Sequence, residues 1–425
     1  INDRRQDHIV FALRGAAGDY EVFPGALTRV SSGESNFTAS ELGGGSKDTW
    51  VLATDHEAGA RTLVVNRAVE IHAPQARVTS RVADSFYWLG RYLERAQNLS
   101  YMVGVVESLE TEELNRAERQ LYRPVWNRVL PPLENRQVGR KRGISSALER
   151  YHLVLDGREE GSVCSTLRRA VRNAGQIMEC LSVEAYGVLR NLEGRFTRAR
   201  FRPGADEASL ALATQRFSAE ATSGIAEFFG MAESTMLADR GWNFCLLGQQ
   251  FERAAITAHA GLGLFKSVAR RTEKAPDPAG HAVEIELSAF LRLLGSRDAY
   301  RRVYKMRAEP VPVLSLLYDN PDMPRSVLRC LGRCQHLLGP KEDDSPGMIR
   351  TRGALEATMK LVAGANWPSY LLPATMGSGE AGGGVQLDPE RLDRLVALLT
   401  DISERTYAID DVIADGFIHH QILLD

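Results

Sequence analysis

Two stretches of this chain place a glutamate directly before an arginine within the same helical pattern. The first contains Glu94 and Arg95, and the second contains Glu252 and Arg253. A glutamate and an arginine on each of two helices could bind a polar or acidic ligand inside a helical bundle. The same residues could instead form reciprocal ion pairs, Glu94 with Arg253 and Glu252 with Arg95, which would avoid the cost of an unpaired buried charge. The residue pattern leaves both alternatives open.

The two stretches form an internal repeat. SRVADSFYWLGRYLERAQN at residues 80–98 aligns with GWNFCLLGQQFERAAIT at residues 241–257 at an offset of 158 residues. Both copies have a glycine four residues before the glutamate, although glycine costs a helix interior about 1 kcal/mol relative to alanine. We therefore expect another backbone or a bulky side chain to approach closely there. The copies differ where the first has Arg91, a further candidate for ligand binding, and the second has Gln249.

A second candidate site lies in GGGSKDTWVL at residues 43–52. Glycines followed by a serine and a lysine would let backbone amides and an ammonium group approach a phosphate. The residues concerned are Gly43, Gly44, Gly45, Ser46 and Lys47. Arg14 and Arg29 lie on preceding extended segments and could converge with the lysine, or be solvated strand charges. Because these glycines open a strand and not a helix, the pattern differs from a P-loop, and an ordinary hairpin loop is the alternative.

The pattern indicates no metal site. Asp411, Asp415 and His419 share a helical face, but this spacing is more typical of a solvated face than of a set of metal ligands. Cys330 and Cys334 are one helical turn apart and lack the second cysteine pair of a zinc knuckle. We interpret them as buried apolar thiols.

The residues before the repeat favour β-structure. Short β-branched or aromatic runs, separated by Gly, Asp and Ser clusters, predict about four strands and an incomplete sheet within residues 8–53. The runs are HIVFALR, YEVFPG, ALTRVSS and DTWVLA. We expect residues 1–55 to form one segment and residues 56–78 to be a linker. Because the strands start within a few residues of Ile1, we expect the chain to begin partway through a domain.

From Ser80 onward the pattern is helical. Apolar residues within 80–99 recur at steps of three and four, and such spacing continues to the C-terminus. The sequence therefore predicts a mainly α fold: a large helical bundle-like domain over residues 79–425 with about ten helices and an internal duplication, preceded by a small partial β-sheet segment. The related halves would span about 79–230 and 231–425. A pseudo-twofold axis could pack the two motif helices against each other.

The overall composition does not favour a nucleic-acid or membrane partner. The chain has 425 residues, of which 44% are hydrophobic, and a formal net charge of −2. Such a charge gives no global field for nucleic acid or an anionic membrane, and no apolar run approaches the roughly 18 residues that span a bilayer. The five cysteines are scattered and do not suggest a disulfide framework. We expect a cytoplasmic protein.

Several phrases also resemble known families. FALRGAAGDYEVFPGALTRV followed by GGGSKDTWVLA resembles the C-terminal end of a circularly permuted ATP-grasp domain of type 2. SRVADSFYWLGRYLERAQN looks like the opening signature of the alpha-E domain, and LSVEAYGVL, RGWNFCLLGQQFERA, AYRRVYKM and MPRSVLRCL extend that resemblance over most of residues 80–420. Ala26 departs from the ATP-grasp pattern, which usually has a second glycine there.

The resemblance to these two families implies a function for the full-length protein. It implies an ATP-dependent carboxylate–amine or peptide ligase, with ATP and Mg²⁺ as cofactors of the full-length protein, and a transglutaminase-like protease among its partners. Most of the nucleotide-binding lobe would lie upstream, so we expect this chain alone neither to catalyse the reaction nor to bind a cofactor strongly. The helical domain would position a partner or acceptor. The alternatives are a non-catalytic helical scaffold and a helical enzyme built around the two Glu-Arg pairs.

Overall fold

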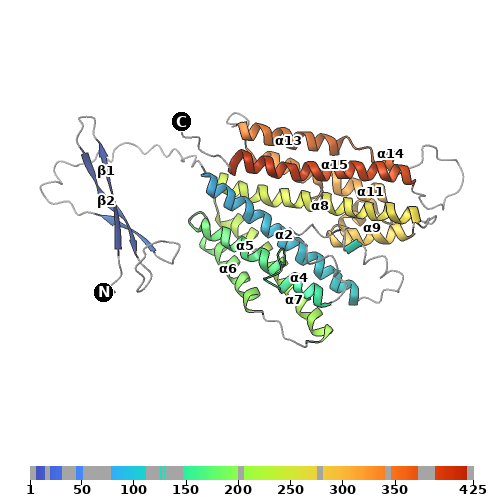
Figure 1. Ribbon diagram of the computed structural model, residues 1–425, viewed down its shortest axis with the longest axis horizontal. Helices are drawn as coiled ribbons and strands as arrows, with labels where there is room; N and C mark the ends of the chain where they lie inside the picture. The colour runs from blue at the N-terminus through green and yellow to red at the C-terminus, as the bar shows by residue number, and fades with distance from the viewer. Residues whose placement is uncertain are drawn as a thin grey trace. The chain divides into compact units, whose positions relative to one another are not determined.

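A computed structural model of the chain describes residues 6–14, 20–30, 45–50, 78–111, 125–126, 129, 147–199, 205–274, 281–339, 346–371 and 388–418. The chain divides into two compact units, Ile1–Ala76 and Arg77–Asp425. The first contains a small antiparallel sheet and the second contains the helices (Figure 1). The predicted mainly α fold with a small β-segment before it is confirmed.

The sheet has three antiparallel strands in the order β1 (Gln6–Arg14), β2 (Tyr20–Val30) and β3 (Gly45–Trp50). The prediction of two separate strands at YEVFPG and ALTRVSS is wrong, because both belong to β2. Pro24 has no N–H to donate, and the register of β1 against β2 shifts between Val10 and Ala12, where β1 passes the proline. This irregularity lets the strand continue through Pro24.

The described residues of the second unit form thirteen α-helices. Those of the first half are α2 (Ser80–Thr111), α4 (Ala147–Leu155), α5 (Val163–Gln176), α6 (Val183–Arg198) and α7 (Glu207–Thr235). Those of the second half are α8 (Arg240–Lys274), α9 (His281–Leu293), α10 (Arg297–Tyr304), α11 (Pro310–Leu314), α12 (Val327–Leu337), α13 (Pro346–Ala363), α14 (Trp367–Leu371) and α15 (Pro389–Ile413). A 3₁₀ turn, Met178–Cys180, and two π-helical turns, Ser315–Asp319 and Ala414–Ile418, complete the set.

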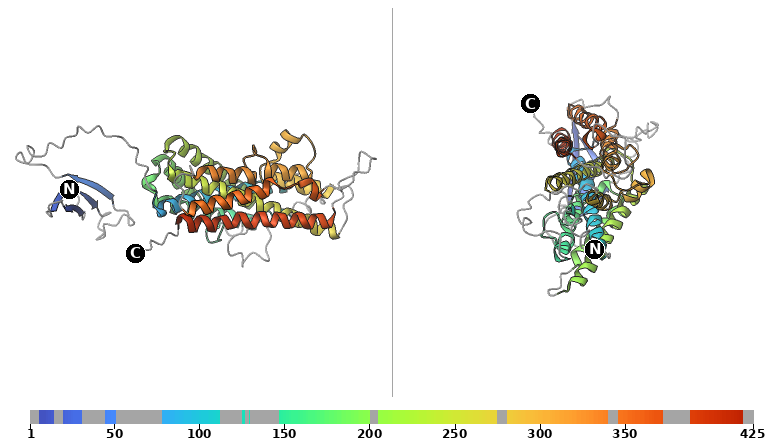
Figure 2. Two further views of the ribbon diagram at one scale, coloured as in Figure 1. Left: turned by 90° about the horizontal axis from the view of Figure 1, so that it is seen from above. Right: turned by 90° about the vertical axis from the view of Figure 1, so that its right-hand side faces the viewer.

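Four helices of each half follow the same packing scheme. In the first half α2 and α6 both pack on α5 and α7, and in the second half α8 and α13 both pack on α12 and α15. The halves meet at α2 and α8, and α8 lies between α2 and α15 (Figure 1). From above, α13 and α15 lie side by side (Figure 2). The arrangement confirms the internal duplication, and the halves divide at residues 236–239, between α7 and α8.

The start of one helix in each half repeats in detail. Ser162 caps α5 and Ser326 caps α12, and each hydroxyl accepts a hydrogen bond from the amide three residues later, at 3.0 and 3.2 Å. Each hydroxyl also donates to the carbonyl oxygen six residues earlier, at 2.6 and 2.5 Å. An N-cap hydroxyl satisfies an amide that the helix leaves unpaired. The duplication therefore extends beyond the Glu-Arg motif.

The helical spacing predicted from Ser80 onward includes the stretch SAFLRLLGSRDAYRRVYKM, which the structure divides between two helices. Residues 288–306 have a continuous helical pattern, yet α9 ends at Leu293 and α10 begins at Arg297. Gly295 between them has φ of +63°, in the left-handed region that only glycine adopts without strain. The turn at Gly295 faces α2, and it forms one wall of the cleft described below.

A continuous apolar core runs through the helical unit. The stripe predicted for α2 lies in it, since Phe86, Leu89, Leu93 and Ala96 are at most 1% exposed. In the described part of the chain, no helix is both long enough and apolar enough to cross a membrane.

Candidate functional site

The helices α2 and α8 run parallel and touch at the two repeated glycines. A Cβ added at Gly90 would overlap the carbonyl oxygen of Cys245, and one added at Gly248 would overlap that of Tyr87. Cys245 is the repeat equivalent of Tyr87, so the two contacts are reciprocal. The expectation of close approach at these glycines is confirmed, and the approaching group is backbone on both sides.

One turn beyond the crossing, the Glu-Arg pairs bind each other. Glu94 accepts hydrogen bonds from Nε and Nη2 of Arg253 at 2.7 and 2.6 Å. Glu252 accepts them from Nε and Nη2 of Arg95 at 2.7 and 3.2 Å. Both carboxylates are buried, with 0% and 4% of their residue surface exposed. Of the two alternatives raised by the sequence, the structure has the reciprocal ion pairs.

Arg91 breaks the symmetry between the halves. Its Nε donates to Glu252 at 2.8 Å, and its Nη1 pairs with Asp410 of α15. The guanidinium also lies against the rings of three aromatic side chains, with its carbon 4.7 to 5.7 Å from the ring centroids of Tyr87, Trp88 and Phe251. Cation–π contacts of this kind stabilise a desolvated arginine. Gln249, at the equivalent position of α8, has no charge and cannot form the corresponding ion pairs.

The ion pairs keep the buried groups charged. Burial opposes ionisation of Glu94, but the Arg253 guanidinium, together with Arg325 and the Asn98 hydrogen bond, holds the pKa of this carboxyl below its ordinary value. Burial likewise opposes ionisation of Glu252, and Arg91 with Arg95 lowers its pKa in the same way. Glu94 and Glu252 are therefore both charged at neutral pH.

On the Glu94 side, a line of polar contacts leads out of the core. Asn98 Nδ2 donates to Glu94 Oε1 at 2.7 Å, and Arg325 Nη1 donates to Asn98 Oδ1 at 2.5 Å. Burial lowers the pKa of Arg325, and the nearby Arg253 guanidinium adds to that effect while Glu94 opposes it. Arginine is basic enough to keep its positive charge near neutral pH in proteins.

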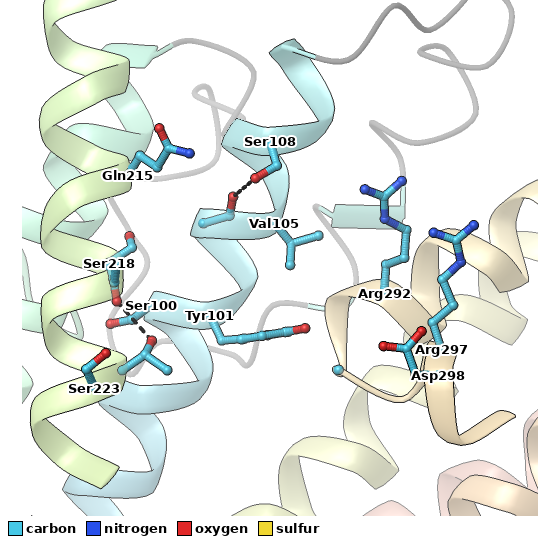
Figure 3. A pocket seen from close by; sticks show the side chains of 14 residues that line it. Ser100, Tyr101, Val105, Ser108, Gln215, Ser218, Ser223, Arg292, Arg297 and Asp298 are labelled. Carbon is cyan, nitrogen blue, oxygen red and sulfur yellow. Dashed lines mark hydrogen bonds between the residues drawn. The ribbon is translucent and has the colours of Figure 1, made fainter. Parts of the chain in front are cut away.

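Arg325 lines a cleft beside the core. The cleft comprises two adjoining cavities of about 560 and 470 Å³, which share Tyr101, Thr222 and Gly295. The smaller cavity is lined by Gln97, Asn98, Tyr101, Thr222, Arg253, Leu294, Gly295, Ala299, Met323, Pro324 and Arg325. In the larger one, serines of α2 and α7 face the charged residues Arg292, Arg297 and Asp298 (Figure 3).

Tyr101 marks the boundary between the two cavities. Its side chain extends from α2 toward the turn between α9 and α10 (Figure 3). A Cβ added at Gly295 would come within 3.3 Å of the Tyr101 ring, so the ring lies against this glycine. Because 40% of Tyr101 is exposed, a bound molecule would meet its ring.

The candidate phosphate-binding residues of the first unit are only partly described. Gly43 and Gly44 lie outside the described residues, whereas Gly45, Ser46 and Lys47 belong to β3. The cross-strand register pairs Arg29 with Ser46 and Lys47 with Thr28. Arg14 pairs with Tyr20, seven residues along β1 from the partner of Arg29, a separation of roughly 23 Å at 3.3 Å per residue. The register therefore does not bring Arg14 next to Arg29.

The cysteine prediction is confirmed. Cys330 and Cys334 are both fully buried, and burial raises the pKa of Cys330 to about 12. Cys334 Sγ contacts the carbonyl oxygen of Leu247 at 3.8 Å. Within the described ranges, no group of three or more His, Cys, Asp or Glu side chains could hold a metal ion. His419, one of the residues considered for a metal, lies outside those ranges.

Most residues that line the cleft were not predicted from the sequence. Arg325 fell within a phrase that resembled the alpha-E domain, but nothing in its spacing linked it to Asn98, which is 227 residues earlier in the chain. The one available signal was the GSR sequence after a helical run at residues 295–297, since a glycine there is consistent with a helix end.

The helix packing and the ion pairs together define an all-α domain of two related halves, which are joined through a duplicated Glu-Arg pair. Residues 78–418 match the Alpha-E family, which is described as a predicted alpha-helical domain with a conserved ER motif. The chain belongs to this family. The match begins after the β-strands and covers the helical unit.

The chain is similar to longer proteins as well. Uncharacterized proteins of Mycobacterium tuberculosis and Mycobacterium bovis are 26% identical to it over 309 residues. The alignments cover 68% of this chain and 33% of each relative. The chain thus spans about a third of the length of the curated relatives it matches. No solved structure matches the chain.

Proposed function

We propose that this chain is the C-terminal part of an ATP-grasp-type carboxylate–amine or peptide ligase, and that its Alpha-E domain positions an acceptor or a partner protein. The observation that carries the positioning role is the cleft. It offers arginines and hydroxyl groups, which bind and orient polar molecules, on helices fixed by buried ion pairs. A site on rigid helices holds a ligand in a defined geometry, which is what an acceptor for a ligase needs.

The ligase activity is proposed for a longer protein. The order of the motifs supports it, since strands resembling the end of an ATP-grasp domain precede the Alpha-E domain. The relatives have further length that such a domain would occupy. The described strands do not themselves fit ATP and Mg²⁺, because Arg14 and Arg29 occur at distant positions of the ladder. We therefore assign no step of the nucleotide chemistry to the described residues.

The Glu-Arg pairs have a structural role in this proposal. Glu94 and Glu252 already accept hydrogen bonds from arginines of the opposite helix. A helical enzyme built around these four side chains would need both carboxylates free to meet a substrate, whereas each of them is buried and bound by arginines. The closed pairs favour a domain that supports chemistry elsewhere.

The proposal can be tested on a longer protein that contains both regions. We expect it to release ADP and form an amide product by mass spectrometry when given ATP, Mg²⁺, a carboxylate and an amine, and we expect this chain alone to do neither. Arg325→Gln should raise the KM for the acceptor and leave the kcat unchanged. ATP binding by this chain alone with sub-millimolar affinity, or absence of ligation by the longer protein, would contradict the proposal.

A second candidate is a non-catalytic scaffold for a transglutaminase-like protease system. The observation that favours it is the closed ion-pair core, in which reciprocal Glu-Arg pairs hold the two halves of the domain together. A stable complex between the chain and such a protease, formed without ATP and unaffected by Arg325→Gln, would favour this candidate over the ligase.

A further inference from the structure

The cleft contains a cation without an anionic partner. Arg253 is neutralised by Glu94, but Arg325 hydrogen-bonds to the neutral Asn98, and in the described part of the chain it forms no ion pair. Arg325 is only half-buried, so its guanidinium lines the cavity. A partly desolvated cation gains most from an anion that shares its low-dielectric surroundings.

The second cavity is lined by charged residues of both signs. Arg297 lines it at the first residue of α10, and within the described residues it forms no ion pair either. Asp298 contributes one negative charge nearby and is exposed. The cleft as a whole therefore has an excess of positive charge, although the chain has a formal net charge of −2.

Unsatisfied hydroxyl groups occur on the opposite wall. The Oγ atoms of Ser100 on α2 and Ser218 on α7 are enclosed and have no hydrogen-bond partner among the described residues. Both serines line the larger cavity, and both are at most 2% exposed (Figure 3). Buried hydroxyls normally have a partner, so these two leave hydrogen-bonding capacity unused beside the cavity.

We propose that the cleft binds a small molecule through an oxyanion, a carboxylate or a phosphate, held by Arg325 beside Arg253. A planar guanidinium can donate two parallel hydrogen bonds to either kind of oxyanion. The rest of the molecule lies along Tyr101 toward the larger cavity, whose volume of about 560 Å³ has room for a ligand larger than a single anion. The assignment rests on the proposed positioning function and identifies the chemical group by which the acceptor is held.

Direct binding to the chain tests the assignment. We would titrate it by calorimetry with N-acetyl-alanine, which has a carboxylate, with inorganic phosphate, and with N-acetyl-alanine amide as the neutral match to the first. We expect N-acetyl-alanine or phosphate to bind and the amide not to bind. The tighter of the two anions identifies the source of the oxyanion. Equal binding of acid and amide, or no binding of either anion at millimolar concentration, would overturn the proposal.

Variants locate the site. Arg325→Gln should weaken anion binding at least about tenfold, which corresponds to ~1.4 kcal/mol. Arg325→Lys keeps the charge without the planar fork and should have intermediate affinity. Arg333→Gln removes one positive charge from an exposed residue of the adjoining helix α12 and should bind like the wild type. Unchanged affinity in both Arg325 variants would overturn the proposal, and the lysine variant keeps the test valid if Arg325→Gln does not fold.

The two proposals can fail separately. If the longer protein ligates but its cleft binds neither anion, only the oxyanion assignment fails. If the anion binds at Arg325 but the longer protein performs no ligation, only the ligase function fails.

Discussion

Glu94 and Arg253 are 159 residues apart in the chain, yet they share two hydrogen bonds in the middle of the core. The pair joins the first half of the domain to the second. Glu252 and Arg95 make the reciprocal connection. Since a buried ion pair is costly to break from one side, each of these residues should affect the stability of the whole domain.

A double-mutant cycle on this pair should show strong coupling. We expect Glu94→Gln or Arg253→Gln alone to lower the free energy of unfolding by about 3–5 kcal/mol, because each leaves an unpaired buried charge, and the double variant to lose less than the sum. Urea unfolding of the wild type and the three variants would measure the coupling free energy. The exposed pair Arg405–Asp401 on α15 is the control, and its cycle should show almost no coupling, because solvent screens an exposed ion pair. Additive effects at the buried pair would contradict its assigned role.

The glycine crossing predicts a steric effect. Alanine at Gly90 or Gly248 would press its Cβ into a carbonyl of the facing helix, so we expect a loss of about 3 kcal/mol or more in unfolding free energy. Gly230 on α7 is the matched control, because nothing lies within 4 Å of an added Cβ. Gly230→Ala should be neutral or stabilise by up to about 1 kcal/mol. A well-folded Gly90→Ala protein of unchanged stability would show that the helices do not touch there.

Acid should weaken the domain through its buried carboxylates. The folded-state pKa values of Glu94 and Glu252 lie below the ordinary 4.5, so their stabilising contribution is complete above that pH. It is lost as the pH falls through the lower folded-state values. We expect the free energy of unfolding to be steady near neutral pH and to fall below about pH 4.5. A Glu94→Gln/Glu252→Gln variant should lose less stability over the same range, and an identical acid profile would refute this linkage.

The two N-cap serines should be equivalent in energy. Ser162→Ala and Ser326→Ala each remove a cap and a hydrogen bond to the preceding loop, so we expect each to cost about 1–2 kcal/mol. Thermal unfolding of both variants would test this. Ser369→Ala, which removes a hydroxyl from an exposed residue, is the control and should cost little. A large effect at only one serine would mean that the halves do not share this feature energetically.

Local periodicity predicted much of the central helix pair. The apolar stripe of α2 and the repeated glycines follow from spacing within a single helix, and the offset between copies supplied the reciprocal partners. The prediction succeeded because duplication converts a local pattern into a long-range one. Asp410 had no such counterpart, and its contact with Arg91 spans 319 residues.

The cleft was not predictable by the same means. It depends on the break between α9 and α10 at Gly295. The apolar pattern continues on both sides of this glycine, so the pattern does not indicate its positive φ. It also depends on Arg325 meeting Asn98, and Arg325 lies outside both copies of the repeated stretch. In the β-segment, spacing predicted strands but not the register that separates Arg14 from Arg29.

The parallel contact of α2 with α8 has a consequence during synthesis. The repeat offset means that the ribosome must add 158 residues between equivalent points of the two helices. At about 5–20 residues per second this takes roughly 8–30 s. Throughout that interval Glu94, Arg91 and Arg95 of the nascent first half lack their partners from α8. The first half can therefore complete its packing only after the second copy has been synthesised.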